Sequence, residues 1–123
     1  MADGRARERV REELKRVLSQ IVEFKARDPL IRSAFPTVMD IHLSVDLRYA
    51  TVYVALAAPP GERAAVLAAF HRDRGFFRSQ LAKEKKLSLR HIPELEFTLD
   101  ETVERSLRLE QLLADEDDAL RSS

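Results

Sequence analysis

The sequence predicts an α+β fold of two layers, in which helices cover one face of a small β-sheet. Apolar residues recur every three to four positions near the N-terminus, as in an amphipathic helix. Alternation of apolar and polar residues follows, as in strands with one buried face. At 123 residues the chain has the size of one domain, which we place at residues 5–100, with a C-terminal segment at 101–123.

The first helix is predicted over residues 5–26, where apolar side chains line one face. Asp28 and Pro29 should end it, because proline cannot continue the hydrogen-bond ladder and disfavours helical geometry in the residue before it. An ordered loop is expected from there to Pro36. The apolar face consists of Val10, Leu14, Val17, Leu18, Ile21 and Phe24.

Two alternating strands follow, over residues 37–47 and 50–56. The polar interruption at 46–49 indicates a hairpin connection, although it lacks the Asn-Gly signature of the tightest turns. A Pro-Pro-Gly run then ends the second strand. The apolar positions of the two strands are Met39, Ile41, Leu43, Val45 and Leu47, then Ala50, Val52, Val54 and Leu56.

A kinked helix pair is predicted next. Residues 62–70 are rich in alanine and have helical spacing, Gly75 should interrupt the helix, and a second piece runs over 76–86. In that piece Ser79, Lys83 and Lys86 should cluster on one face. The predicted element order is therefore helix, strand, strand, helix, kink, helix, with one more strand to come.

That third strand has its apolar positions at Ile92, Leu95, Phe97 and Leu99, and Pro93 near its start favours an edge position. A short amphipathic helix is predicted over residues 101–113. The acidic tail beyond it should be frayed and partly disordered. It either keeps the protein soluble or shields a basic surface.

Charge is unevenly distributed along the chain. The whole sequence has 21 basic and 21 acidic residues. Residues 71–91, however, contain 7 basic and 2 acidic groups, a net charge of +5, whereas residues 92–123 contain 3 and 10, a net charge of −7. Positive charge is thus concentrated around the predicted helix pair.

Candidate catalytic or metal-binding residues are few. Without cysteine there is neither a disulfide nor a thiolate site, and the three histidines lie far apart in the sequence. His42, Ser44 and Asp46 share one face of a strand, but a catalytic triad also needs an oxyanion site, which nothing supplies. We expect no enzyme and no cofactor, and a soluble, cytoplasmic protein without signal or membrane-spanning segment.

The basic stretch favours phosphate binding. A helix that restarts after Gly75 presents free backbone N–H groups and the positive end of its dipole. Glycine-containing bends between two helices clamp nucleic-acid backbones in KH modules. The alternative is a solvated face with a helix break. The candidate RNA-binding residues are Arg72, Arg74, Gly75, Arg78, Lys83, Lys85, Lys86 and Arg90.

The sequence motifs of this region resemble those of the ribosome-binding factor A family. Its members show a glycine, an aromatic or leucine and an arginine, then L-x-L-R and P-E-L-x-F. The matching residues here are Gly75, Phe76, Arg78, Leu87-Ser88-Leu89-Arg90 and Pro93-Glu94-Leu95-Glu96-Phe97. VDLRYATVYVAL at 45–56 is similar to the family's strand pair, and the resemblance spans roughly residues 5–112.

The resemblance implies a type II KH-like fold (α-β-β-α-kink-α-β) with a C-terminal helical tail. It also implies a monomeric assembly factor that binds 16S rRNA in the immature 30S subunit and supports late maturation and processing of the 16S rRNA 5′ end. Activity in the cold and assembly GTPases as partners are further implications. The alternative function is a protein-interaction module that uses the helix at 101–113.

The kink departs from the family pattern at one residue. The family has A-x-G there, whereas this chain has Asp73, Arg74 and Gly75, so Asp73 stands in place of the alanine. An aspartate in this place can cap the restarted helix and add negative charge. We expect the kink to be structural and the neighbouring cations to contact phosphate.

Aromatic residues near the kink are expected mainly in the core. Phe77, and less strongly Phe76, have core spacing beside Leu81. Tyr53 should lie on the sheet surface. The arginines at positions 5, 7 and 9 could extend the basic surface, but glutamates at 8, 12 and 13 are interleaved with this stretch, so a solvated face is expected.

Overall fold

The computed structural model describes residues 4–85, 87–102 and 110–115 of the chain. Its element order is helix, strand, strand, helix, helix, strand, as predicted, with two short helices added. The long elements are α1 (Gly4–Lys25), β1 (Thr37–Leu43), β2 (Tyr49–Ala55), α3 (Arg63–Arg72), α4 (Arg74–Ala82) and β3 (Glu94–Leu99). The two short ones are α2 (Pro29–Ser33) and the 3-10 helix η1 (Pro60–Glu62).

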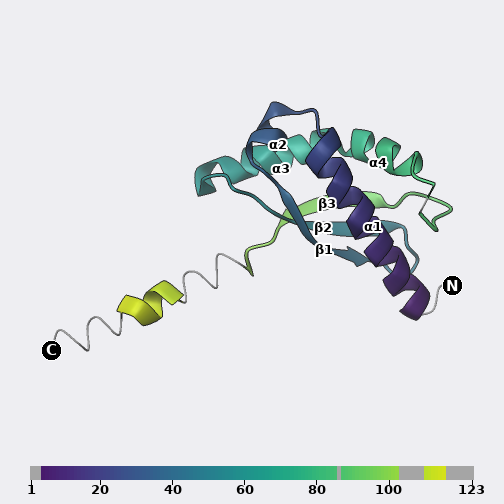
Figure 1. The fold of residues 1–123 in the computed structure, drawn as a ribbon, viewed down its shortest axis with the longest axis horizontal. Helices are drawn as coiled ribbons and strands as arrows, with labels where there is room; N and C mark the ends of the chain where they lie inside the picture. Colours follow the sequence, from purple (N-terminus) through teal and green to yellow (C-terminus); the bar gives the residue numbers. More distant parts are fainter. Residues whose placement is uncertain (1–3, 86, 103–109, 116–123) are drawn as a thin grey trace.

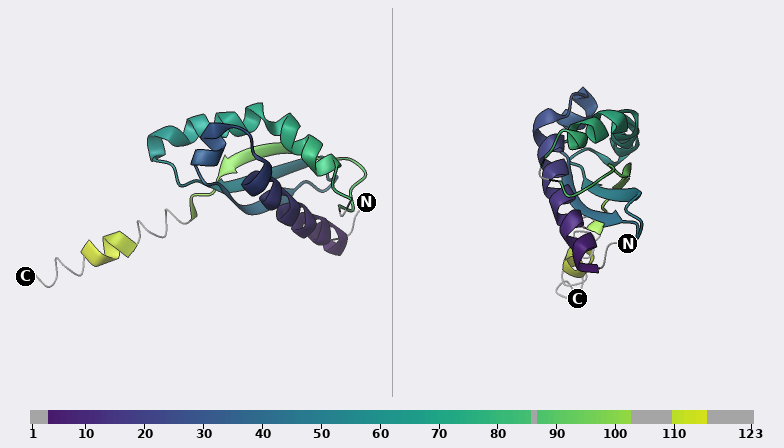
Figure 2. Two further views of the ribbon diagram at one scale, coloured as in Figure 1. Left: turned by 45° about the horizontal axis from the view of Figure 1, so that its top comes forward. Right: turned by 90° about the vertical axis from the view of Figure 1, so that its right-hand side faces the viewer.

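The three strands form one sheet in the order β1-β2-β3, with β1 antiparallel and β3 parallel to β2. Strand β3 is thus an edge strand, as Pro93 predicted. The helices lie together on one side of the sheet (Figures 1 and 2), which gives the two-layer arrangement expected of a type II KH-like fold. The other face of the sheet exposes its side chains.

The core lies between the sheet and helices α1, α3 and α4. Apolar side chains from every long element are buried there, and the rings of Phe70, Phe77 and Phe97 pack with centroids 4.7–5.6 Å apart. Each buried aromatic side chain removes a large apolar area from water. His71 joins the cluster from α3 by accepting a hydrogen bond from the N–H of Phe97, at 3.2 Å, on the free edge of β3.

The first predicted helix is correct in its bounds but wrong in one core residue. Phe24 is 76% exposed, and Val22 is buried in its place. The predicted loop to Pro36 contains a short helix, α2, because Asp28 caps it through the N–H of Leu30 at 2.8 Å and Pro29 occupies its first position. The residues that stop α1 therefore also start α2.

The first strand is shorter than its alternation predicted. It ends at Leu43, and Val45 lies exposed in the turn. The pairing of β1 with β2 shifts between Val38 and Asp40, so Met39 is an extra residue in a bulge and is only half-buried. Alternation in the sequence gave no sign of this bulge.

The break between α3 and α4 lies at Asp73, two residues before the predicted position at Gly75. Asp73 has a ψ of 7°, yet its N–H donates to the carbonyl of Ala69 at 3.0 Å and its carbonyl accepts from the N–H of Phe77 at 3.1 Å. One residue thus leaves the helical conformation while the ladder continues on both sides. Gly75 lies in the first turn of α4 and has no positive φ.

The second helix of the pair ends at Ala82 and not at residue 86. Lys83 is the C-cap of this helix, four residues after Ser79, and Lys86 lies outside the described residues. Of the predicted C-terminal helix, the structure describes residues 101–102 and 110–115, the latter as helix. The acidic tail beyond Asp115 lies outside the described residues.

Candidate RNA interface

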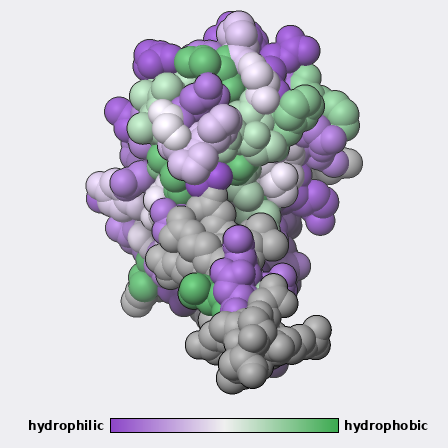
Figure 3. All heavy atoms as spheres, turned by 90° about the vertical axis from the view of Figure 1, so that its left-hand side faces the viewer, coloured by the Kyte–Doolittle hydropathy of each residue, from purple (hydrophilic) through white to green (hydrophobic). Residues whose placement is uncertain are grey.

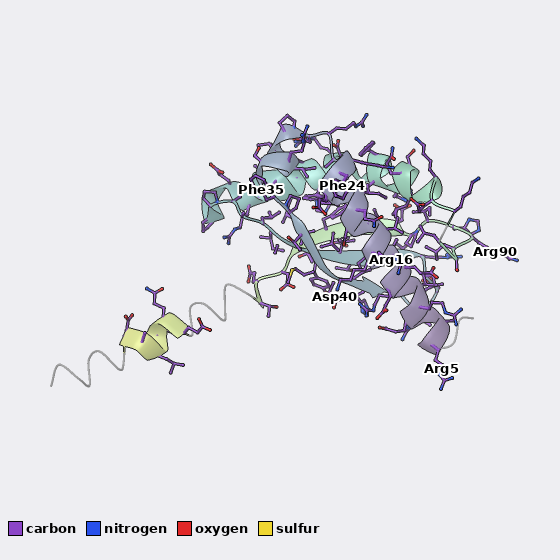
Figure 4. The ribbon with its side chains drawn as sticks, in the orientation of Figure 1. Arg5, Arg16, Phe24, Phe35, Asp40 and Arg90 are labelled. Atoms are coloured by element: carbon purple, nitrogen blue, oxygen red, sulfur yellow. The ribbon has the colours of Figure 1, made fainter. Side chains whose placement is uncertain are left out.

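Four of the predicted cations lie exposed around α4 and the loop that follows it. Arg74 is at the start of α4, Lys83 is at its end, and Lys85 and Arg90 are in the loop. Within the part of the chain that the structure describes, none of the four has a carboxylate partner within 4.0 Å. Arg90 points away from the body at one end of the molecule (Figure 4).

Arg78 has a different role, because its guanidinium is occupied within the protein. Its Nε donates to the carbonyl of Pro93 at 3.0 Å and one terminal nitrogen donates to the carbonyl of Ile92 at 2.9 Å. The other terminal nitrogen lies 3.5 Å from Glu94. Arg78 therefore fixes the end of the loop to α4, and its sequence position alone did not reveal this.

Arg72 is also partly engaged. Its guanidinium lies 3.6 Å from Asp28, the residue that caps α2, so it joins the end of α3 to the start of α2. The Arg72 side chain remains 60% exposed and keeps donors for a ligand. Among the described residues, therefore, Arg74 at the kink has no carboxylate partner and Arg72 has a partial one.

The start of α4 is open to solvent. N–H groups in the first turn of a helix have no acceptor in that helix. Asp73 occupies the capping position but its side chain makes no capping hydrogen bond, so the capping prediction is wrong. A Cβ added at Gly75 would meet nothing within 4 Å, and both Arg74 and Gly75 are exposed.

Phe77 lies in the core, and Phe76 packs against it. Phe77 is fully buried, as predicted. Phe76 is half-buried against the core, and the guanidinium of Arg27 lies over its ring at 4.0 Å from the centroid. Phe76 is thus a packing residue that the side chain of an arginine covers.

Of the three residues that could suggest a triad, His42 lies in β1, whereas Ser44 and Asp46 lie in the turn between β1 and β2. The Ser44 hydroxyl donates to Asp46 at 2.7 Å and accepts from the N–H of Tyr49 at 3.0 Å. The hydrogen bond from the Ser44 hydroxyl, and after it the one from the Arg48 N–H, hold the pKa of Asp46 below its ordinary value. Ser44 and Asp46 therefore brace a turn.

Most of the N-terminal arginines face solvent, but one of them binds a strand of the sheet. Arg5 and Arg9 are exposed on α1, as expected for a solvated face. Sequence reasoning missed Arg11, which binds Glu8 and reaches Asp40 in the bulged strand at 2.6 Å. Its hydrogen bond is the main reason that the pKa of Glu8 is lowered.

The described residues form neither a cluster of metal ligands nor a membrane-spanning helix. Among residues 4–85, 87–102 and 110–115, no three histidine or acidic side chains gather as metal ligands would. The same residues include no helix with the length and apolar character to span a membrane. The end of the molecule in Figure 3 mixes hydrophobic and hydrophilic side chains.

Known proteins with similar sequences share one family description. The model of the family "Ribosome-binding factor A" matches residues 6–113. A relative of that name from Roseiflexus sp. (strain RS-1) is 37% identical over 106 residues, covering 86% of this chain and 79% of its own.

Comparison of folds gives the same family description. A solution NMR structure of a Thermotoga maritima protein, described as a putative ribosome binding factor A, has a TM-score of 0.63 and 34% identity, covering 74% of this chain and 83% of its own. A homology model of Thermus thermophilus ribosome binding factor A, fitted into the cryo-EM map of a 30S complex with that factor, has a TM-score of 0.59 and 27% identity, covering 75% of this chain and 92% of its own. That relative is thus described in contact with the small subunit.

Proposed function

Because the chain belongs to the ribosome-binding factor A family, we propose that it binds 16S rRNA in the immature 30S subunit as an assembly factor. One observation carries the proposal from the geometry. In a chain with equal numbers of acidic and basic residues, four exposed cations lie at the two ends of α4 and in the loop after it, without a carboxylate partner among the described residues. Phosphate is the ligand that such a surface suits.

The proposed contacts begin at the kink and continue along the loop after α4. Arg74 and the N–H groups at Gly75 would take one phosphate, and Lys83, Lys85 and Arg90 would follow the backbone. Lys86 completes the candidate set from the sequence. Arg78 belongs to the interface as the residue that holds the loop in place.

Binding alone can perform the proposed work. A factor that binds one rRNA conformation more tightly than another shifts the equilibrium between them by the difference in binding free energy. Family membership supports a role in late maturation, 16S rRNA 5′-end processing and growth in the cold. It also supports a monomeric, cytoplasmic protein that acts beside assembly GTPases and has no catalytic activity of its own.

The test of the site is a charge reversal that spares the fold. Lys83→Glu with Lys85→Glu removes two exposed cations that have no carboxylate partner in the described part of the chain, so we expect 30S binding in co-sedimentation to weaken strongly. The slope of log affinity against log salt should fall by about 1 for each lost phosphate contact. Arg78 is unsuitable for this test because its replacement would also release the loop.

Arg5→Glu with Arg9→Glu is the matched control, since it makes the same change in net charge at exposed positions of α1. We expect the control pair to retain most of the affinity. Equal losses in both variants would show that net charge, and not this surface, governs binding.

A second candidate function is a protein-interaction module at the C-terminal helix. Leu112 and Leu113 are 63% and 56% exposed in the helical residues 110–115, which favours an apolar partner. Replacing both with aspartate should leave 30S binding intact if rRNA contacts dominate. Loss of 30S binding in that variant would favour the interaction module.

A further inference from the structure

A groove at one end of the molecule combines an exposed aromatic ring with cationic and apolar side chains. It lies between the turn that joins β1 to β2 and the loop that leads into β3, and its volume is about 560 Å³. Its first wall includes Leu47, Arg48 and Tyr49, and its second includes Leu89, Arg90 and Ile92. This end holds the loop whose Arg90 extends from the body in Figure 4.

Tyr49 is the aromatic residue of the groove. It begins β2 and is 61% exposed, although tyrosine rings usually cover apolar surface. No ring or cation contact involves it in the described part of the chain. A free aromatic face beside cations is the arrangement on which nucleic-acid bases stack.

The first wall is held rigid by its own hydrogen bonds. Asp46 accepts from the Ser44 hydroxyl and from the N–H of Arg48, and the N–H of Leu47 donates to the carbonyl of Ser44 at 3.0 Å. Leu47 has a φ of 61°, a left-handed conformation that is costly for a residue with a side chain. This turn is therefore fixed in one shape with Tyr49 at its end.

The second wall is fixed independently. Arg78 holds the carbonyls of Ile92 and Pro93, and Glu13 of α1 accepts from the N–H of Ser88 at 3.1 Å. A further hydrogen bond, from the N–H of Glu94 to the carbonyl of Arg48 at 2.8 Å, joins the two walls. Walls fixed before binding lower the entropy lost on binding.

The charges of the groove favour an anionic occupant. It contains two carboxylates, and both are already engaged: Asp46 in the turn and Glu94 3.5 Å from Arg78. Arg90 has no such partner among the residues that the structure describes, and Arg48 is 79% exposed with its Nε 3.8 Å from Asp46. Phosphate oxygens can therefore be met by Arg90 and by the free donors of Arg48.

We propose that this groove binds one unpaired nucleotide of single-stranded RNA, with the base stacked on Tyr49 and the adjoining phosphates at Arg48 and Arg90. Leu89 and Ile92 would cover the edge of the base. The inference rests on the proposed function and adds to it a base-stacking subsite apart from the kink. It predicts that the protein prefers an rRNA segment with an unstacked base over a continuous duplex.

The test uses the two tyrosines of the chain, which lie on the same face of β2. Tyr49→Ala should weaken binding to purified 30S subunits and to a short single-stranded RNA by roughly 5- to 150-fold, the range for loss of one stacked base. Tyr49→Phe should keep the affinity, because it keeps the ring. Tyr53→Ala, outside the groove, should bind like the unaltered protein.

Tyrosine fluorescence gives a second readout, since the chain contains no tryptophan. In Tyr53→Phe, Tyr49 is the sole tyrosine, and single-stranded RNA should quench its emission while a duplex of the same sequence should not. In Tyr49→Phe, Tyr53 is the sole tyrosine. This variant therefore measures the loss of emission that comes from absorption of light by the RNA and not from stacking. Equal quenching in the two variants would overturn the proposal.

The outcomes separate the groove from the function on which it rests. If the unaltered protein binds 30S subunits and Tyr49→Ala binds equally well, the groove proposal fails while the proposed function stands. If Tyr49→Leu binds as well as Tyr49→Phe, the contact is apolar and not stacking, which also overturns the nucleotide site. If the unaltered protein does not bind 30S subunits, both proposals fail.

Discussion

Arg78 shows how the contacts of a side chain can differ from what its type and position indicate. In the sequence it is one of seven cations in a basic stretch, and phosphate binding is the obvious interpretation. In the structure its donors meet two main-chain carbonyls of the loop before β3. A carbonyl acceptor cannot be seen in a sequence pattern, because it depends on where the backbone of another segment lies.

We predict that Arg78→Ala lowers the free energy of unfolding by about 1–2 kcal/mol, since it removes charge-assisted hydrogen bonds from a half-buried site. Urea unfolding measures the change. Arg74→Ala is the control, because Arg74 is exposed on the same helix, and it should change stability by less than about 0.5 kcal/mol. Equal stability of the two variants would contradict the bracing role of Arg78.

At the scale of elements, the kinked helix pair was predicted from the sequence but its break was misplaced. Glycine has a low helix propensity, so Gly75 was the natural position for the interruption. The first turn of a helix tolerates such a residue, however, because its N–H groups need no acceptor within the helix. The conformational change falls on Asp73 instead.

Asp73→Ala tests what the aspartate does at this break. Its side chain caps nothing, so we expect thermal stability to stay within about 0.5 kcal/mol of the unaltered protein. RNA affinity should rise, because a negative charge leaves the positive end of α4. A clear loss of stability in thermal unfolding, with unchanged affinity, would instead restore the capping role.

Other elements were predicted correctly from local patterns in the sequence. Strong apolar alternation placed β2 correctly, and Pro93 indicated the edge position of β3. The bulge at Met39 and the exposure of Phe24 could not be predicted, since both depend on tertiary packing. The Tyr49 groove was also missed, because its walls come from segments about forty residues apart that only the fold brings together.

At the scale of the whole molecule, charge is separated between regions. The open face of the sheet carries Asp40, Glu94 and Glu96, while free cations gather around α4 and its loop. A protein with this division can bind RNA through the cations around α4, its loop and the groove at Tyr49 without being strongly basic as a whole. Electrostatic attraction would also orient it as it approaches the subunit.

The salt dependence of 30S binding tests the central claim most directly, namely that phosphate contacts hold this protein on the small subunit. Affinity for purified 30S subunits, measured by co-sedimentation across a range of salt concentrations, should fall linearly in a plot of log affinity against log salt, because each neutralised phosphate releases bound counterion. We expect a slope of about −3 to −5, as contacts from Arg74, Lys83, Lys85, Arg90 and the kink would give. An affinity that does not change with salt would contradict the account.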